Sequence, residues 1–509
     1  MGRFFKKKQN LSSNKNESTN ETTDKPVLFD SLDKNVETIS ELFKDVDILR
    51  LKYINCCDRR LTCCIIFCDG MVDQSVINES IINPLMLSSV KDTDSVYTLM
   101  TQVIQIGGMK ETDNVDEIVE AIAYGDTVLF AEGLGQAIIL DTKGFQSRPI
   151  NEPENEKNLS GSREGFTESL LVNLSMIRRR VLTSELKMKS YTIGRRTKTK
   201  AYICYMDGLV NKQILSELYR RLDKIDIDAV LDTNYITELI HDSPWSPFRT
   251  IGYTERPDAV VGKLLEGRIA IFLDGSPAVL TLPYLFIENF QSSEDYYLNF
   301  YYTSFSRMVR IIGFFLSVIV PSVYIAAVAF HHEMMPLQLF INITSERQTV
   351  PLPASLEALI MLFVFDILRE TGVRMPSNIG QTLSIVGALV IGQAAVEAKL
   401  VAAPMIIVVA LTGITGLLIP KLNSPIVYIR LMLLLLATAF GFYGIILGVS
   451  CVLIHIINLR SFGVPQLTIS GKLRFQDIKD TVIRAPWWMM ILRPGFAEDR
   501  VRSKEGGKS

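Results

Sequence analysis

Cysteine is the residue type in this sequence that most invites a chemical interpretation, because five of the seven cysteines are crowded into one short stretch: Cys56, Cys57, Cys63, Cys64 and Cys68. A zinc site is usually marked by CxxC spacing and often by a nearby His, and this stretch has neither mark. Neighbouring cysteines on a strand also point to opposite faces. We therefore predict thiols buried as small apolar side chains. Metal binding is the less favoured alternative, and no metal ligand is assigned.

Charged side chains inside an apolar run are the second candidates for chemistry. The run Ser355–Gly372 contains Glu357, Asp366, Arg369 and Glu370. Charges in such a segment are costly in lipid and are expected to face protein or water. Arg369 follows Asp366 by three residues, a spacing that permits an ion pair within one helix. A structural ion pair and a part in an ion pathway are both open readings of these residues.

The sequence does not support any of the catalytic motifs that it partly resembles. The stretch His331–Pro336 (HHEMMP) resembles the start of a zinc-protease motif, but Pro336 stands where the second His ligand is needed. No phosphate-binding GxxxxGK[ST] loop occurs, and four histidines leave little for general-base chemistry. The formal net charge of −2 gives no reason to expect a nucleic-acid partner. We predict a protein that is not an enzyme and needs no cofactor.

The N-terminal half, which must position the cysteines, contains a repeated unit. IIFCDG at 65–70 and ICYMDG at 203–208 each end an apolar stretch at Asp-Gly. After each Asp-Gly, apolar residues recur at helical spacing, up to Leu85 in the first copy and Leu222 in the second. Each copy therefore predicts a strand, a turn and a helix with one buried face.

A second pair of similar stretches extends the repeat. Residues 115–140 align with residues 257–282 in a constant register that pairs Gly125 with Gly267. Both stretches predict a helix and then two strands joined by an acidic residue and glycine, because glycine tolerates the positive φ of a hairpin turn. Turn chemistry explains these acidic pairs better than a role as catalytic carboxylates. We infer that the N-terminal half holds a duplicated α/β unit.

Basic residues give two expectations for this half. Arg178, Arg179 and Arg180 end a predicted helix at 163–181. They predict a solvated or ion-paired face, with contact to anionic lipid as the weaker alternative. No apolar core follows the basic N-terminal residues, and the polar stretch up to Lys25 is typical of a disordered tail rather than a signal peptide. We therefore expect this half to stay in the cytoplasm.

The C-terminal half contains long apolar runs that predict a membrane domain, since about 20 apolar residues span a bilayer. The runs lie at 311–330, 355–372, 379–396, 401–419 and 431–459. The last run is too long for one upright helix and short for two, so a tilted helix or a hairpin that adds a sixth span would fit. Basic residues beside both ends of the domain place both ends in the cytoplasm, which requires an even number of spans. We favour a last run that crosses or re-enters the membrane twice.

Small residues form a stripe along the run at 379–396. Glycine and alanine at helical spacing allow helix backbones to approach closely. The residues alone favour plain packing of helices within one chain. A ring of such helices could instead form a narrow apolar constriction that gates by dewetting. The candidate pore-lining residues are Ser384, Val386, Gly387, Val390 and Ile391.

Together these patterns predict a cytoplasmic α/β region of two repeated α/β subdomains, joined to a polytopic α-helical membrane domain with five or six spans. The expected division of the chain is a disordered polar tail (1–34), a first α/β subdomain (35–150), a helical linker (151–190), a second α/β subdomain (191–300), a transmembrane helical domain (301–460) and a polar C-terminal tail (461–509).

Long stretches of the chain also resemble one protein family. They are REGFTESLLVNLSMIRRR at 163–180, the stretches at 255–297 and 347–396, SFGVP at 461–465, and RAPWWMMILRP at 484–494. Over residues 40–495 the chain resembles the A subunit of the GerA family of spore germinant receptors. Ser160 stands where an arginine is expected, and the residues after SFGVP lack the expected aromatic and prolines. These departures concern local linker and tail contacts rather than membership.

The resemblance implies a receptor subunit in the spore inner membrane, with its N-terminal region on the spore-core side. It implies two partner proteins, a transporter-like B subunit thought to bind nutrient and a C-subunit lipoprotein, besides membrane lipid. It also implies a homo-oligomeric ring that passes ions when nutrient is sensed, which makes the helix at 379–396 the candidate pore helix. A non-conducting scaffold that couples a sensing partner to downstream germination factors is the alternative. A secondary transporter is less favoured, because inverted membrane repeats with interrupted helices are not found.

Overall fold

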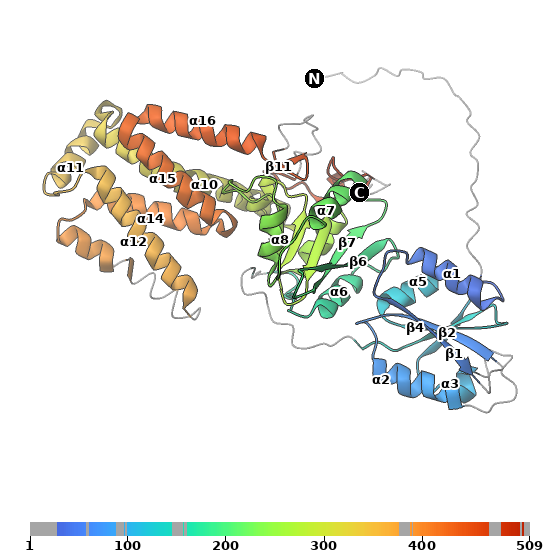
Figure 1. Cartoon of the computed structure of the whole chain (residues 1–509). Coiled ribbons are helices and arrows are strands. Elements are labelled where there is room, and N and C mark those ends of the chain that lie inside the picture. Colours follow the sequence, from blue (N-terminus) through green and yellow to red (C-terminus); the bar gives the residue numbers. More distant parts are fainter. Residues whose placement is uncertain are drawn as a thin grey trace, which may run out of the picture.

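The chain folds as an α/β region of two similar units followed by a bundle of helices (Figure 1). This computed structural model describes residues 28–56, 61–87, 96, 99–144, 156, 160–375, 387–388, 390–467, 480–498 and 501–502. Most of the expected N-terminal tail lies outside the described residues. The α/β region is blue to green in Figure 1, and the bundle is yellow to orange.

The first unit is a five-stranded antiparallel sheet with helices on both faces. Its strands are ordered β1-β2-β4-β5-β3. They are β1 (Leu49–Cys56), β2 (Leu61–Cys68), β3 (Met109–Thr112), β4 (Thr127–Ala131) and β5 (Ala137–Leu140). Its helices are α1 (Leu32–Leu42), α2 (Gln74–Val76), α3 (Asn83–Leu87) and α5 (Val115–Tyr124), with π-helical turns η1 (Ile77–Ile82) and η2 (Leu99–Val103).

The second unit repeats this topology, with strand order β6-β7-β9-β10-β8. Its strands are β6 (Leu186–Ile193), β7 (Thr199–Met206), β8 (Gly252–Thr254), β9 (Ile269–Leu273) and β10 (Val279–Leu282). Its helices are α6 (Leu170–Arg178), α7 (Lys212–Leu222), α8 (Thr233–Ile240) and α9 (Pro257–Leu264), followed by the 3-10 turns η3 (Phe286–Phe290) and η4 (Ser293–Tyr296). The two sheets therefore have the same strand order, as expected for a repeated unit. β6 starts within the range expected to be linker.

The turns between the paired strands have the backbone that the sequence predicts. Gly133 joins β4 to β5 with φ of +80°, and Gly275 joins β9 to β10 with φ of +85°. Such angles are disfavoured for residues with a Cβ atom. The acidic residue and glycine in each pair therefore form a turn rather than a site.

Three apolar cores hold the α/β region together. One core lies between the units and takes residues from both, including Val128 of β4 and Phe272 of β9. Each unit also has its own outer core beneath its amphipathic helix segment. A parallel bridge joins Val46 to Met188 of β6, where the Met188 N–H donates to the Asp45 carbonyl at 3.1 Å. The two units thus share a core and a backbone contact.

The C-terminal region is a bundle of helices. Its elements are α10 (Phe300–Ala329), the short α11 (Leu337–Arg347), α12 (Ala354–Arg374), a helical stretch at 390–397, α14 (Ala403–Leu417), α15 (Asn423–Phe440) and α16 (Phe442–Asn458). Within the described ranges, α10 and the segment Pro420–Phe440 are long and apolar enough to cross a membrane, while α14 and α16 are apolar but shorter.

The run at 431–459 folds as two helices. α15 ends at Gly441, whose φ of +59° and ψ of −137° break the helix before α16 begins. α16 folds back closely on α15, since a Cβ atom on Gly448 would lie 2.4 Å from the Leu433 side chain. The alternative of one long tilted helix is therefore wrong for this run.

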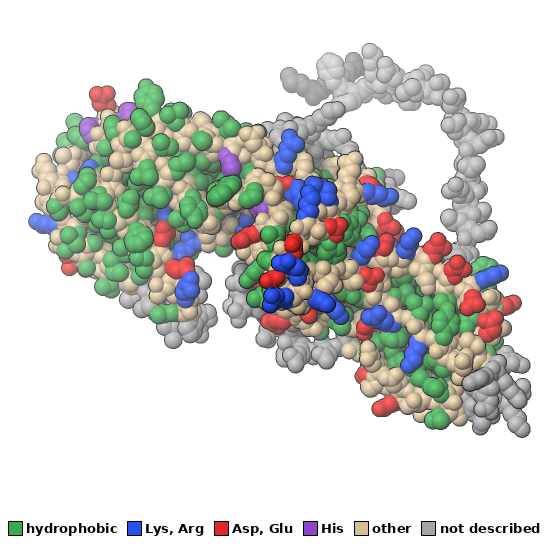
Figure 2. Space-filling model, viewed as in Figure 1, with side chains coloured by type: hydrophobic (Ala, Val, Ile, Leu, Met, Phe, Trp, Pro, Cys, Tyr) green, Lys and Arg blue, Asp and Glu red, His purple; other side chains and the backbone are tan. Residues whose placement is uncertain are grey.

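The surfaces of the two regions differ in kind (Figure 2). Apolar side chains cover the visible face of the bundle, whereas Lys, Arg, Asp and Glu gather over the α/β region. Exposed apolar residues in the bundle include Ile407, Ile414, Tyr443 and Leu447, each more than 60% exposed. Such a surface is suited to lipid or to protein partners rather than to water.

Candidate functional site

Glu357 is a fully buried carboxylate within the bundle. Its Oε2 accepts a hydrogen bond from the Ala402 N–H at 3.2 Å, and Arg347 Nε lies 3.8 Å from its Oε1. An isolated buried carboxylate would be strongly unfavourable. The contacts let Glu357 join the end of α11, the start of α12 and the start of α14. The residue faces protein here rather than an aqueous path.

Asp366 pairs across helices and not along its own helix. Its Oδ2 lies 2.6 Å from Nη2 of Arg430 on α15, and Arg430 is only 5% exposed. The sequence spacing permitted a pair with Arg369, but α15 supplies a buried partner at ion-pair distance instead. Glu370, near the end of α12, pairs with the exposed Arg374 at 2.6 Å.

The candidate pore helix is described only in part. Ser384 and Val386 lie outside the described residues. A Cβ atom on Gly387 would lie 3.1 Å from the Leu368 side chain of α12, so this small residue packs inside the chain. Val390 and Ile391 point outward and are 58% and 39% exposed. A pore-lining role for these residues stays a prediction.

The cysteines of β2 point into two separate cores. Cys63 lies in the outer core of the first unit, while Cys64 and Cys68 lie in the core shared by both units. Burial raises the pKa of Cys64 to about 11 and also raises that of Cys68. The thiols of Cys64 and Cys68 are therefore protonated at neutral pH, and all three cysteines pack as apolar groups. Cys57 and the side chain of Cys56 lie outside the described parts of the chain.

The three consecutive arginines have different environments. Arg179 and Arg180 both pair with Glu164, as an ion-paired face predicts. Arg178 is fully buried between the two units, so the solvated face predicted for all three is wrong at this position. Its Nη1 donates to the Thr183 carbonyl at 2.9 Å, and its guanidinium lies 5.8 Å from the ring centre of Phe43. The docking of the first unit on α6 encloses this side chain.

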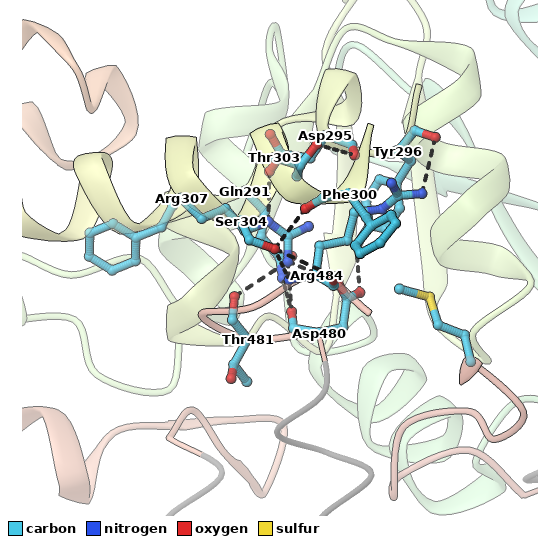
Figure 3. Close-up of polar contacts among 12 residues, drawn as sticks. Gln291, Asp295, Tyr296, Phe300, Thr303, Ser304, Arg307, Asp480, Thr481 and Arg484 are labelled. Carbon is cyan, nitrogen blue, oxygen red and sulfur yellow. Dashed lines mark hydrogen bonds and ion pairs between the residues drawn. The ribbon is translucent and has the colours of Figure 1, made fainter. Parts of the chain in front are cut away.

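A buried network of charges lies where α10 leaves the α/β region (Figure 3). We call Asp295, Arg307, Arg310, Asp480 and Arg484 the junction network. Arg307 Nε lies 2.8 Å from Asp295 Oδ2, and its Nη1 lies 2.8 Å from Asp480 Oδ1. Arg310 Nη1 lies 3.0 Å from Asp295 Oδ1. Arg307 and Asp295 are almost completely buried.

Hydrogen bonds from uncharged donors complete the network. The Tyr296 hydroxyl donates to Asp480 Oδ2 at 2.7 Å, and Gln291 Nε2 donates to the Asp480 carbonyl at 2.6 Å. The Arg484 N–H donates to Ser304 Oγ of α10 at 3.1 Å. Burial, with the Asp480 carboxylate adding to it, raises the pKa of Tyr296 well above its ordinary value, so this hydroxyl remains a donor. The network fastens η4, the start of α10 and the C-terminal segment to one another.

A second buried ion pair fastens the second sheet to η3. Arg268, just before β9, pairs with Glu288 of η3 and donates to the Pro283 carbonyl at 2.7 Å. Lys263 of α9 lies 3.1 Å from the other Glu288 oxygen. Burial would raise the pKa of Glu288, but the charges of Arg268 and Lys263 outweigh it and lower this pKa. Since η3 leads through η4 into α10, the pair holds the sheet to the base of the bundle.

The junction network was missed by reasoning from sequence. In the sequence, Arg307 and Arg310 are simply basic residues beside an apolar run. Asp480 and Arg484 come from a segment almost two hundred residues away. The stretch RAPWWMMILRP carries a family resemblance and has no charge pattern that predicts a pair. No local spacing connects these positions, so only the fold identifies them as partners.

Comparisons with known proteins agree on the family. The family described as Bacillus/Clostridium GerA spore germination protein matches residues 35–496. Spore germination protein KA of Bacillus subtilis strain 168 is 41% identical over 487 residues, which cover 94% of this chain and 89% of that protein. The uncharacterized membrane protein YfkQ of the same organism is 42% identical over 446 residues, 87% of each chain.

One solved structure is also similar in sequence. It is the crystal structure of the N-terminal domain of the A subunit of the Bacillus megaterium spore germinant receptor GerK3. It shares 31% identity, covers 51% of this chain and 98% of its own, and has a TM-score of 0.42. The family match spans nearly the whole described chain, from the first helix of the α/β region to the segment that closes the junction network. This chain belongs to the GerA family of spore germination proteins.

Proposed function

We propose that this chain is the A-type subunit of a germinant receptor in the spore inner membrane, with its α/β region on the cytoplasmic, spore-core side. Family membership carries the proposal, and the relatives named as spore germination proteins support it. The proposed partners are a transporter-like B subunit and a lipoprotein C subunit. Spores that lack this chain should lose their response to one class of nutrient; an unchanged response to every nutrient would contradict the proposal.

The bundle is proposed to cross the membrane six times. The first turns of α10 and the end of α16 both contact the second α/β unit: Arg307 Nε lies 2.8 Å from Asp295 Oδ2 of η4, and Ser246 Oγ lies 2.8 Å from His455 Nε2. A chain that enters and leaves a bundle at the same end crosses it an even number of times. The break at Gly441 supplies the additional crossing.

The proposed activity is a nutrient-gated ion channel formed by a ring of A subunits. The observation that supports it best is the outward position of Val390 and Ile391, which leaves an apolar face uncovered in a single chain. In a ring, equivalent faces would meet at the axis and form a narrow apolar constriction. Val386, outside the described residues, is proposed for the same face.

The channel proposal is tested by ion flux from vesicles that hold the complete receptor. Val390→Ala should widen the constriction and release ions without nutrient. Ile407→Ala is the matched control, because Ile407 is an apolar residue that is 70% exposed on α14. Equal flux from both variants, with or without nutrient, would contradict the pore assignment.

A non-conducting scaffold is the second candidate. The junction network favours it, because a buried ionic connection suits a subunit that passes a conformational signal between its regions. The two functions differ in oligomeric state: a chain that remains monomeric in native-like bilayers and never conducts would support the scaffold and exclude the ring.

A further inference from the structure

All three tryptophans of the chain are exposed. Trp245, Trp487 and Trp488 have exposed fractions of 99%, 54% and 61%. Tryptophan is usually well buried, because its large ring gains much by leaving water. Exposure of more than half of every tryptophan therefore points to a surface that another phase or molecule covers.

Trp487 and Trp488 lie beside the start of α10. The Trp488 ring centre is 6.0 Å from that of Phe300, the first residue of α10, and the Trp487 ring centre is 5.9 Å from that of Tyr296. The hydrogen bond from the Arg484 N–H to Ser304 holds the preceding residues against the same helix. The two indoles are thus fixed next to the point where the chain enters the bundle.

The outer face of α10 continues this apolar surface. Exposed residues follow one another at helical spacing: Tyr301, Phe305, Met308, Ile312 and Phe315. Arg307 and Arg310, on the same turns, point inward to the junction network. An uncharged stripe therefore runs from the two tryptophans into the apolar length of α10.

Trp245 lies beside the end of α16. Its neighbour Ser246 contacts His455 in the last turn of that helix at 2.8 Å, and Phe248 packs near the same imidazole at 6.0 Å between ring centres. The exposed tryptophans therefore mark the place where the chain enters the bundle and the place where it leaves.

We propose that these tryptophans are membrane anchors seated in the headgroup zone of the bilayer, on the side of the α/β region. The inference rests on the proposed function, which takes α10 across a membrane. Indole rings favour the membrane–water interface because one edge is polar and the body is apolar. The stripe on α10 joins the anchors directly to the lipid-facing part of the helix. A bilayer also covers both helix ends with a single surface, whereas a protein partner would need to reach two separate places.

The full-length protein, reconstituted in phosphatidylcholine vesicles, provides the test. Bromine atoms on the lipid chains quench tryptophan emission at short range, and they are placed near the headgroups in one set of vesicles and near the chain ends in another. Trp245→Phe leaves Trp487 and Trp488 as reporters, and the double variant W487F/W488F leaves Trp245. Both variants should emit at shorter wavelength than in water and lose more emission to the shallow bromines than to the deep ones.

A third variant separates this inference from the proposed function. With all three tryptophans replaced by Phe, Phe315→Trp reports on the exposed face of α10 within its apolar length. If this reporter is quenched by bromolipid while the native tryptophans are quenched only by acrylamide in water, the anchor assignment is overturned and membrane insertion stands. If neither is quenched by bromolipid, membrane insertion fails and the anchors fail with it. Native tryptophans that are shielded from both quenchers would assign the surface to a protein partner and overturn the proposal.

Discussion

The two α/β units have the same topology but use one equivalent position in opposite ways. Asp126 and Arg268 each follow a glycine, Gly125 or Gly267, that lies between a helix and the first strand of the next hairpin. Asp126 pairs at 2.8 Å with Lys143, whose side chain is 27% exposed. Arg268 pairs with Glu288, and both of these side chains are less than 10% exposed. Charge and burial at this position differ although the strands around it correspond.

The difference follows from what each ion pair connects. In the first unit the pair joins residues on either side of the β4–β5 hairpin, so it affects only that unit. In the second unit the pair reaches η3 and thereby the base of the bundle. Burial raises the pKa of Asp126 despite the opposing charge of Lys143, whereas the cations around Glu288 lower the pKa of that residue. The repeat therefore preserves the fold, while the buried charges adapt the second unit to hold the bundle.

Removal of Arg268 should cause the largest loss of stability and so test the difference between the two units at this position. Arg268→Ala leaves Glu288 buried with one cation fewer, and loss of a partner from a buried pair costs about 3–5 kcal/mol of unfolding free energy. Asp126→Ala is the matched control and should cost about 1 kcal/mol or less, because Lys143 can reach water. Urea unfolding of the purified full-length protein in mild detergent measures both. Equal losses would remove the distinction between the units.

Alanine at the hairpin glycines should affect both units equally. Gly133 and Gly275 have φ of +80° and +85°, and a Cβ atom at either would contact nothing within 4 Å. The cost therefore comes from the backbone alone, about 1–2 kcal/mol at each position. The same urea experiment applies to Gly133→Ala and Gly275→Ala. A loss in one unit that is several times that in the other would show that the turns are not equivalent.

A smaller change in the central strands tests whether the two sheets pack alike. Ile65 of β2 and Ile203 of β7 occupy matching places in the repeat, and both are fully buried. Ile→Val at either position should cost about 0.5–1.5 kcal/mol through one lost methylene group. Thermal unfolding of the two single variants, beside the double variant, would show whether the losses add. Strong coupling between them would contradict the separate outer cores in which they lie.

A fall in pH should have the smallest effect on stability. It should destabilise the amphipathic helix of the second unit, α7, more than the corresponding helix of the first unit. Hydrogen bonds from Arg220 and Arg221 lower the pKa of Glu217 to about 2. Because the folded-state pKa lies below the ordinary value, the stabilisation is present above about pH 4.5 and is lost as the pH falls towards 2. The contribution of this surface cluster is about 0.5 kcal/mol.

The measurement is stability against pH for Glu217→Gln, which should show a flatter acid limb than the unchanged protein. Glu79 is the matched residue of the first unit, where Ile82 and Asn83 stand at the spacing of the two arginines. Glu79→Gln removes the same charge where no arginine pair stands, and it is the control. An equal flattening in both variants would attribute the effect to net charge rather than to the arginines.

Much of the fold followed from local patterns in the sequence. The duplicated strand–helix and helix–hairpin stretches predicted both units, because alternation, helical spacing and turn glycines act over a few residues. The opposite faces of Cys63 and Cys64 followed from the geometry of a strand for the same reason. The small-residue run at 379–396 predicted close helix packing, and Gly387 does approach α12.

Tertiary structure alone decided which charges meet when their residues lie far apart in the sequence. Asp366 pairs with Arg430 of α15 rather than with its neighbour Arg369, and Arg178 is shielded from solvent because the first unit docks on α6. Asp480 joins Arg307 across 173 residues. The sequence by itself determined the elements and their repeat, since these depend on short-range backbone and patterning preferences. The buried ion pairs depend on which surfaces exclude water together, and that is decided only when the elements pack.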